Sequence, residues 1–106
     1  MSLRRCLLLL MALWMGGSAW AQFDHGHAGW DALLKKHVRW LPDATQSRVD
    51  YNGFKTDRAA LQQVLDAMSA VPKAEFERWP REQQMTFLVN AYNAFTVALI
   101  LTRWPE

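Results

Sequence analysis

Apolar residues recur at helical spacing in three long segments of the chain. In residues 30–41 they recur at intervals of three and four, and Pro42 ends the pattern. Residues 56–70 carry a second apolar stripe behind Thr56, which we expect to cap the helix. The longest segment, residues 80–103, starts with a proline, which favours the first turn of a helix. The pattern therefore predicts a mainly α protein of three main helices, the third of them long and buried.

The stretches between these segments are less regular. Residues 43–55 break the helical period, and Asn52-Gly53 indicates a turn. We therefore expect a loop there, in which residues 49–51 could form a short strand. Residues 73–79 lie between two prolines and predict a short turn of helix.

The first 21 residues have the pattern of a secretory signal peptide. Arg4 and Arg5 precede an apolar stretch at residues 6–15, and an Ala-Trp-Ala sequence ends at Ala21. We expect cleavage after Ala21, a mature chain that starts at Gln22, and a periplasmic or secreted location. The apolar stretch is well short of the roughly 20 residues that a bilayer span needs, so no membrane span is expected after cleavage.

Removal of this segment changes the charge and the cysteine content. The chain has 12 Lys+Arg and 10 Asp+Glu, and two of the arginines lie in the signal. The remainder is neutral, ten against ten, which argues against nucleic-acid binding. The only cysteine, Cys6, also lies in the signal, so residues 22–106 contain no thiol nucleophile and no thiolate ligand for zinc. The glycines do not have the spacing of a phosphate-binding loop, and we expect no cofactor.

Two asparagines interrupt the apolar run of the third helix. At about 100° per residue, one face of this helix carries Met85, Leu88, Tyr92, Phe95 and Leu99. The opposite side carries Gln83, Thr86, Asn90 and Asn93, and it continues toward the C-terminus with Ala94, Val97, Ile100 and Leu101.

The asparagines make this helix the candidate polar site. A buried amide without a partner costs about 1–3 kcal/mol, so we expect Asn90 and Asn93 to bond to the backbone of loops that cross the helix. The alternative is that one of them lines a cleft and orients a substrate or a catalytic group. Tyr92, between them, is expected to pack on the apolar face with its hydroxyl at the rim.

The three histidines suggest different roles. His25 and His27 are weak candidates for metal ligands, because two imidazoles two residues apart converge if the segment is extended. No cysteine or carboxylate at ligand spacing completes such a site, and the alternative is a polar lead into the first helix. His37 lies on an apolar stripe and is expected to be a hydrogen-bonded core residue.

Several of these blocks together resemble the domain of unknown function 547 family. The matching blocks are WDALL at 30–34, VDY at 49–51, VP at 71–72, AEF at 74–76, Trp79, and FLVNAYNAFTV at 87–97. The resemblance covers essentially all of residues 22–106 and implies the N-terminal part of a larger, mostly helical α+β domain. In that family, blocks with a histidine and a Ser-Cys-Pro motif follow the asparagine helix, so the resemblance implies a truncated chain.

Two functional hypotheses follow. The first is an exported binding or scaffold module with no independent catalysis in this fragment and with unknown partners. The alternative is the N-terminal portion of a thiol-type hydrolase or transferase, whose cysteine and histidine lie in the missing C-terminal part. Whether the protein is an enzyme stays open at this point.

Overall fold

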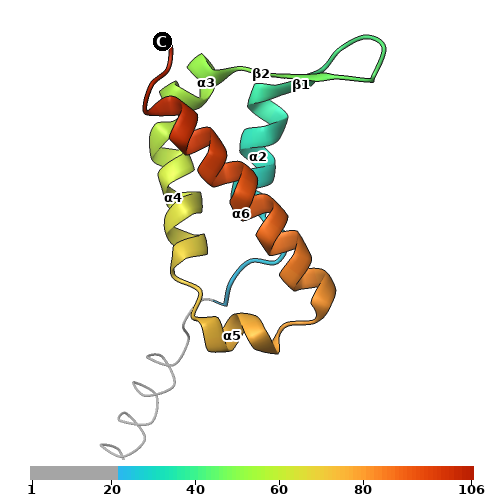
Figure 1. Ribbon diagram of the computed structural model, residues 1–106, viewed down its shortest axis with the longest axis vertical. Coiled ribbons are helices and arrows are strands. Elements are labelled where there is room, and N and C mark those ends of the chain that lie inside the picture. Colours follow the sequence, from blue (N-terminus) through green and yellow to red (C-terminus); the bar gives the residue numbers. More distant parts are fainter. Residues whose placement is uncertain (1–21) are drawn as a thin grey trace, which may run out of the picture.

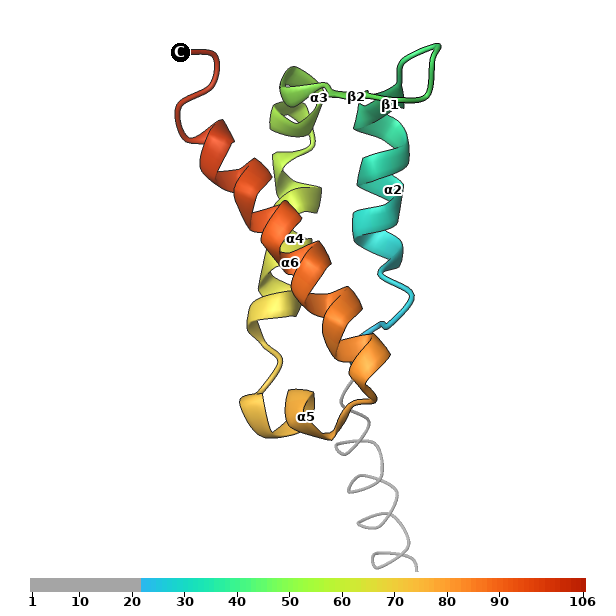
Figure 2. The same cartoon turned by 45° about the vertical axis from the view of Figure 1, so that its right-hand side comes forward.

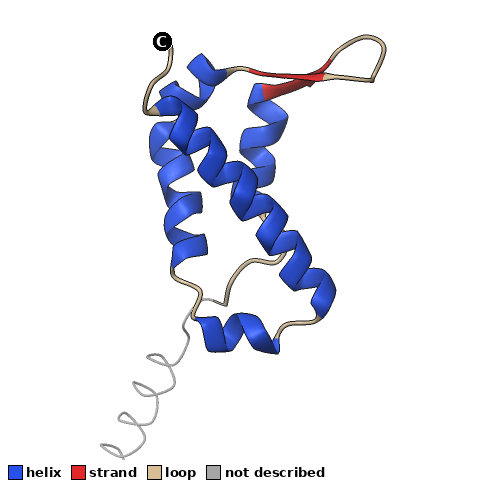
Figure 3. Cartoon of the chain, viewed as in Figure 1, coloured by secondary structure: helices blue, strands red, loops and turns tan. Residues whose placement is uncertain are grey.

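The computed structural model describes residues 22–106, and the expected signal peptide, residues 1–21, lies outside them. Five helices and one small hairpin make up the described chain (Figure 3). In order they are α2 (Ala28–His37), β1 (Val38–Trp40), β2 (Ser47–Val49), α3 (Tyr51–Thr56), α4 (Arg58–Ser69), α5 (Lys73–Arg78) and α6 (Arg81–Leu101). The prediction of a mainly α protein is confirmed.

The three longer helices form the body of the structure. α4 packs against both α2 and α6, and α6 runs diagonally across the other two (Figures 1 and 2). The hairpin and α3 lie at one end, and α5 lies at the other. The buried apolar core consists of Trp30, Leu33, Phe54, Leu61, Leu65, Met68, Ala94, Val97 and Leu101.

The first helix ends earlier than its apolar spacing predicts. α2 stops at His37, and Val38–Trp40 turn into a strand that pairs antiparallel with Ser47–Val49, with Val38 opposite Val49. The valines and the tryptophan favour extended backbone. Pairing of the two strands gives the backbone N–H and C=O groups the hydrogen bonds that another helical turn would have supplied. The possible strand at 49–51 is thus displaced toward the N-terminus.

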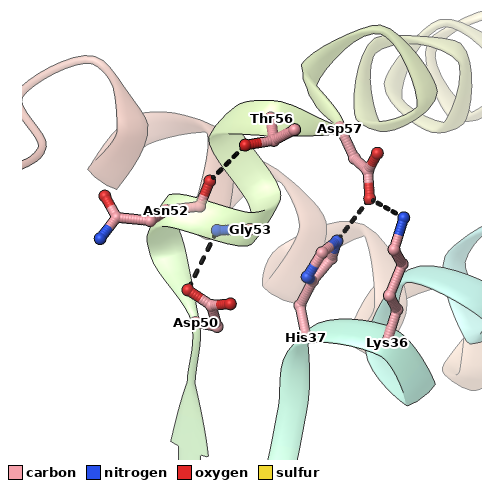
Figure 4. Close-up of polar contacts among 7 residues, drawn as sticks. All are labelled: Lys36, His37, Asp50, Asn52, Gly53, Thr56 and Asp57. Atoms are coloured by element: carbon pink, nitrogen blue, oxygen red, sulfur yellow. Dashed lines mark hydrogen bonds and ion pairs between the residues drawn. The ribbon is translucent and has the colours of Figure 1, made fainter.

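Asn52-Gly53 forms part of a helix and not the expected turn. Asp50 precedes α3, and its carboxylate accepts a hydrogen bond from the Gly53 N–H at 3.0 Å (Figure 4). Thr56 does not cap the next helix, because its hydroxyl donates to the Asn52 carbonyl at 3.1 Å. Asp57 occupies the cap position of α4 instead.

His37 is the hydrogen-bonded core residue that the sequence predicts. It is 5 % exposed, and its Nε2 lies 2.6 Å from the Asp57 carboxylate (Figure 4). Lys36 Nζ contacts the same carboxylate oxygen at 2.8 Å. Hydrogen bonds from Lys36 and then His37 lower the pKa of Asp57, although desolvation opposes them. The cluster joins the end of α2 to the start of α4.

The long helix lies where the sequence predicts it, but it is buried on one side only, whereas the sequence predicts burial on most sides. Pro80 precedes α6, as expected, and the helix extends over 21 residues. Its buried residues are Ala94, Val97 and Leu101, all on the side that packs against α4 and α3. The opposite apolar face is exposed, because no other described element covers it. α6 is also long and apolar enough to cross a membrane, judged by length and composition alone.

Candidate functional site

Unpaired buried polar groups are concentrated in one short segment before and within the first turn of α2. Four buried side-chain nitrogens have no hydrogen-bond partner among residues 22–106: Nδ1 of His25, both ring nitrogens of His27, and Nε1 of Trp30. Buried polar atoms are normally paired, because an unpaired one costs about 1–3 kcal/mol. Such a concentration within six residues marks the segment His25–Trp30 as a candidate site.

His27 has the least usual conformation in this segment. Its backbone is left-handed, with φ 51° and ψ 43°, a region that residues with a Cβ seldom adopt. Asp24 holds this turn: its carboxylate accepts the N–H groups of Gly26 and Ala28, both at 2.9 Å, and its carbonyl accepts that of His27. These backbone hydrogen bonds also lower the pKa of Asp24.

Burial determines the charge of the His27 ring. The residue is 8 % exposed, and desolvation lowers the pKa of its imidazole, although the Asp24 carboxylate acts in the opposite direction. We therefore treat the ring as neutral at pH 7. A neutral imidazole has one N–H donor and one acceptor nitrogen, and both are free here among the described residues.

Aromatic rings hold the histidines in place. Phe23 makes edge contacts with His25 and His27, at centroid distances of 5.6 and 5.1 Å. Trp79 contacts His25 at 4.4 Å, and Phe87 at the start of α6 contacts Phe23. The segment is thereby fixed against both the α5–α6 connection and α6 itself.

A large cavity that is open to solvent adjoins His27, and more than half of its lining residues are exposed. Its volume is about 700 Å³, and its walls come from residues 22–27, α2, α4 and the start of α5. Leu33, Val64 and Met68 supply apolar wall, and Trp30 lines the cavity beside His27. A cavity of this size and character is typical of sites for small molecules, which range over about 300–1,000 Å³.

A smaller cavity, of about 190 Å³, also adjoins His27. His25, His27, Glu82, Gln83 and Thr86 line it. The structure thus brings the two histidines to the first half of the polar stripe on α6. Within residues 22–106, however, no three His, Cys, Asp or Glu side chains are placed to hold a metal ion together.

The two asparagines and Tyr92 lie away from both cavities. Asn93 is exposed, Asn90 is half-buried, and Tyr92 is 74 % exposed. None of the three side chains forms a hydrogen bond within residues 22–106, so the expected bonds to crossing loops are not formed there. The amides have access to water, so neither needs a partner within the protein.

We accordingly expect Asn90→Ala and Asn93→Ala to leave the free energy of unfolding within about 0.5 kcal/mol of the wild type. Each change removes no described hydrogen bond, and alanine favours the helix more than asparagine does. Urea unfolding monitored by circular dichroism measures the effect. Leu101→Ala, on the buried side of the same helix, is the control and should cost about 2–5 kcal/mol. A loss of 1–3 kcal/mol for either asparagine would show that it has a buried partner after all.

Comparisons with known proteins add no relative: no protein-family model, curated protein or solved structure matches the chain. The resemblance to the domain of unknown function 547 family therefore stays a prediction.

The sequence alone does not indicate that Trp30 belongs to a site or that a large cavity adjoins it. The spacing of α2 marks Trp30 simply as core, and nothing local reveals that its N–H has no partner.

Proposed function

We propose that this chain is an exported binding module that holds a small, uncharged and mainly apolar molecule in the large cavity. The observation that carries the proposal is the cavity of about 700 Å³ between α2 and α4, lined in part by His27 and Trp30, whose buried ring nitrogens are unpaired. Apolar walls supply affinity, and a few polar groups supply orientation. Residues 22–106 contain no cysteine, so the proposal assigns no thiol chemistry to them.

The polar atoms define the kind of ligand. Trp30 Nε1 is a donor, and a neutral His27 offers one donor and one acceptor. An alcohol or an amide group can both accept a hydrogen bond from the donors and donate one to the acceptor. The nitrogens are covered by protein atoms. Ligand binding therefore requires the rings of His27 and Trp30 to shift.

Charged ligands are disfavoured by the surroundings. The carboxylate of Asp24 lies beside His27, and Glu75 also lines the cavity. Lys36 is the cation in the lining, and it is paired with Asp57. An anion would meet these carboxylates. A cation would lose hydration against the apolar walls, and the attraction of Asp24 and Glu75, screened by water at this open site, would offset only part of that loss. A neutral molecule avoids both costs.

The test uses benzyl alcohol as the probe and the secreted protein, labelled with ¹⁵N. Titration should shift the indole N–H resonance of Trp30, assigned with Trp30→Phe, in a saturable way at pH 7. Benzoate and benzylammonium should bind at least about tenfold more weakly. The mass of the same preparation tests export, because cleavage after Ala21 leaves a chain that starts at Gln22. A product that retains residues 1–21 would contradict the proposed location.

A matched pair of variants tests the cavity itself. Ala59 and Ala67 are both exposed on α4, but only Ala67 lines the cavity. Ala67→Phe should fill part of the space and weaken benzyl alcohol binding at least about tenfold, and Ala59→Phe should leave it unchanged. Equal affinities in the two variants, or no saturable shift of Trp30, would overturn the proposal.

A further inference from the structure

Of the seven large hydrophobic side chains that are exposed among the described residues, all but Trp40 lie on one face of α6. Six of its side chains are 45–74 % exposed: Met85, Leu88, Val89, Tyr92, Phe95 and Leu99. At roughly 150–250 Å² for each fully exposed large side chain, they present on the order of 700 Å². Monomeric proteins seldom leave a contiguous apolar patch of that size uncovered.

This face has the spacing of a coiled-coil seam. Met85, Leu88, Tyr92, Phe95 and Leu99 are separated alternately by three and four residues, which is the a and d pattern of a heptad repeat. The buried residues Ala94 and Val97 lie on the other side of the helix, where α6 meets its own core. A second helix can therefore pack on the seam without displacing any described contact.

We propose that the α6 seam binds a second copy of this chain, with the two α6 helices antiparallel. In an antiparallel pair, each a position meets a d position of the other helix. A register centred between Asn93 and Ala94 places Leu88 opposite Leu99 of the second copy. The same register places Tyr92 opposite Phe95, so the surface is complementary to itself, as a twofold interface requires.

Charge favours the antiparallel direction. Residues 83–102 contain no charged side chain, and the seam is bounded by Arg81 and Glu82 at one end and by Arg103 and Glu106 at the other. Antiparallel packing brings Glu82 of one copy to Arg103 of the other, twice. Parallel packing would instead place like charges together at each end. Neither Glu82 nor Arg103 forms an ion pair within residues 22–106.

The area is sufficient for such a pair. A standard interface buries about 800 Å² on each partner, close to what the seam presents. A lipid surface fits less well, because Asn93 flanks the seam and its amide would lose water without gaining a partner. The large cavity is lined by residues 22–75 and not by α6, so this inference does not depend on the proposed function.

Sedimentation velocity of the secreted protein at about 100 μM should give twice the monomer mass. Leu88→Lys with Leu99→Lys should weaken the dimer by more than about 100-fold, because each lysine would face the other in the register above. Both leucines are more than half exposed, at 53 % and 70 %, so the fold should survive, as circular dichroism will check. A monomer at this concentration would overturn the proposal, whether or not it floats with phosphatidylcholine–phosphatidylglycerol vesicles.

A charge swap tests the direction. Glu82→Lys and Arg103→Glu should each weaken the dimer by about three- to tenfold, and the double variant should restore the wild-type affinity. A parallel dimer would not be weakened by either single change, since like charges would stay together. That result, or a double variant as weak as the singles, would overturn the antiparallel arrangement.

Discussion

Replacement of Phe54 by alanine is expected to lower the free energy of unfolding by about 3–5 kcal/mol, the largest effect of any substitution considered for this protein. Phe54 is 0 % exposed, and its ring stacks on Trp30 at 5.9 Å and contacts His37 at 4.9 Å. Its removal leaves a cavity between α2 and α3. A domain of this size is stable by roughly 0.05–0.15 kcal/mol per residue, so the variant loses a large share of the total.

Urea unfolding followed by far-ultraviolet circular dichroism measures this loss. Phe54→Leu is the matched control, because it keeps most of the buried volume and should cost about 1–2 kcal/mol. If Phe54→Ala cost less than 1 kcal/mol, the ring would not be part of a closed core.

Gly53→Ala should lower the free energy of unfolding by about 2 kcal/mol or more, although alanine favours a helix over glycine by about 1 kcal/mol. A Cβ at this position would contact Nδ1 of His37, and it would lie 2.7 Å from Cε1 of His37 and 2.6 Å from an Asp50 carboxylate oxygen. The His37 ring has little room to move, because Asp57 holds its Nε2 and Phe54 packs against it. Steric overlap therefore outweighs the gain in helix propensity.

Gly29→Ala is the control for this prediction. Gly29 also lies in a helix, but a Cβ there would meet only a Val64 methyl group, at 3.3 Å. We expect this variant to be as stable as the wild type or slightly more stable in the same urea experiment. A Gly53→Ala variant that gained stability would show that α2 and α3 are not in close contact.

Hydrophobic periodicity was sufficient to locate the two longest described helices. The pattern in residues 56–70 and 80–103 predicted α4 and α6 closely, because each helix repeats its apolar positions over several turns. It did not predict the hairpin or α3. Val38–Trp40 and Asn52-Gly53 have local preferences that several conformations satisfy, and their contacts with the rest of the fold select one.

The candidate site was likewise predicted only in part from the sequence. The sequence singled out His25 and His27 as a pair and Asn90 and Asn93 as polar positions in an apolar helix. It did not predict that the histidines face Glu82, Gln83 and Thr86, or that a large cavity adjoins His27. Those neighbours lie more than 50 residues away in the chain, and no local pattern encodes such a distance.

By itself, the sequence determined that this protein is mainly helical, that α6 is its longest helix, and that His37 belongs to its core. The tertiary structure decided which side of α6 is covered. The C-terminal half of that helix is apolar on two opposite sides, so its pattern does not decide which of them is buried. Only the position of α4 and α3 determines that Ala94, Val97 and Leu101 are buried while Leu88, Tyr92 and Leu99 remain exposed.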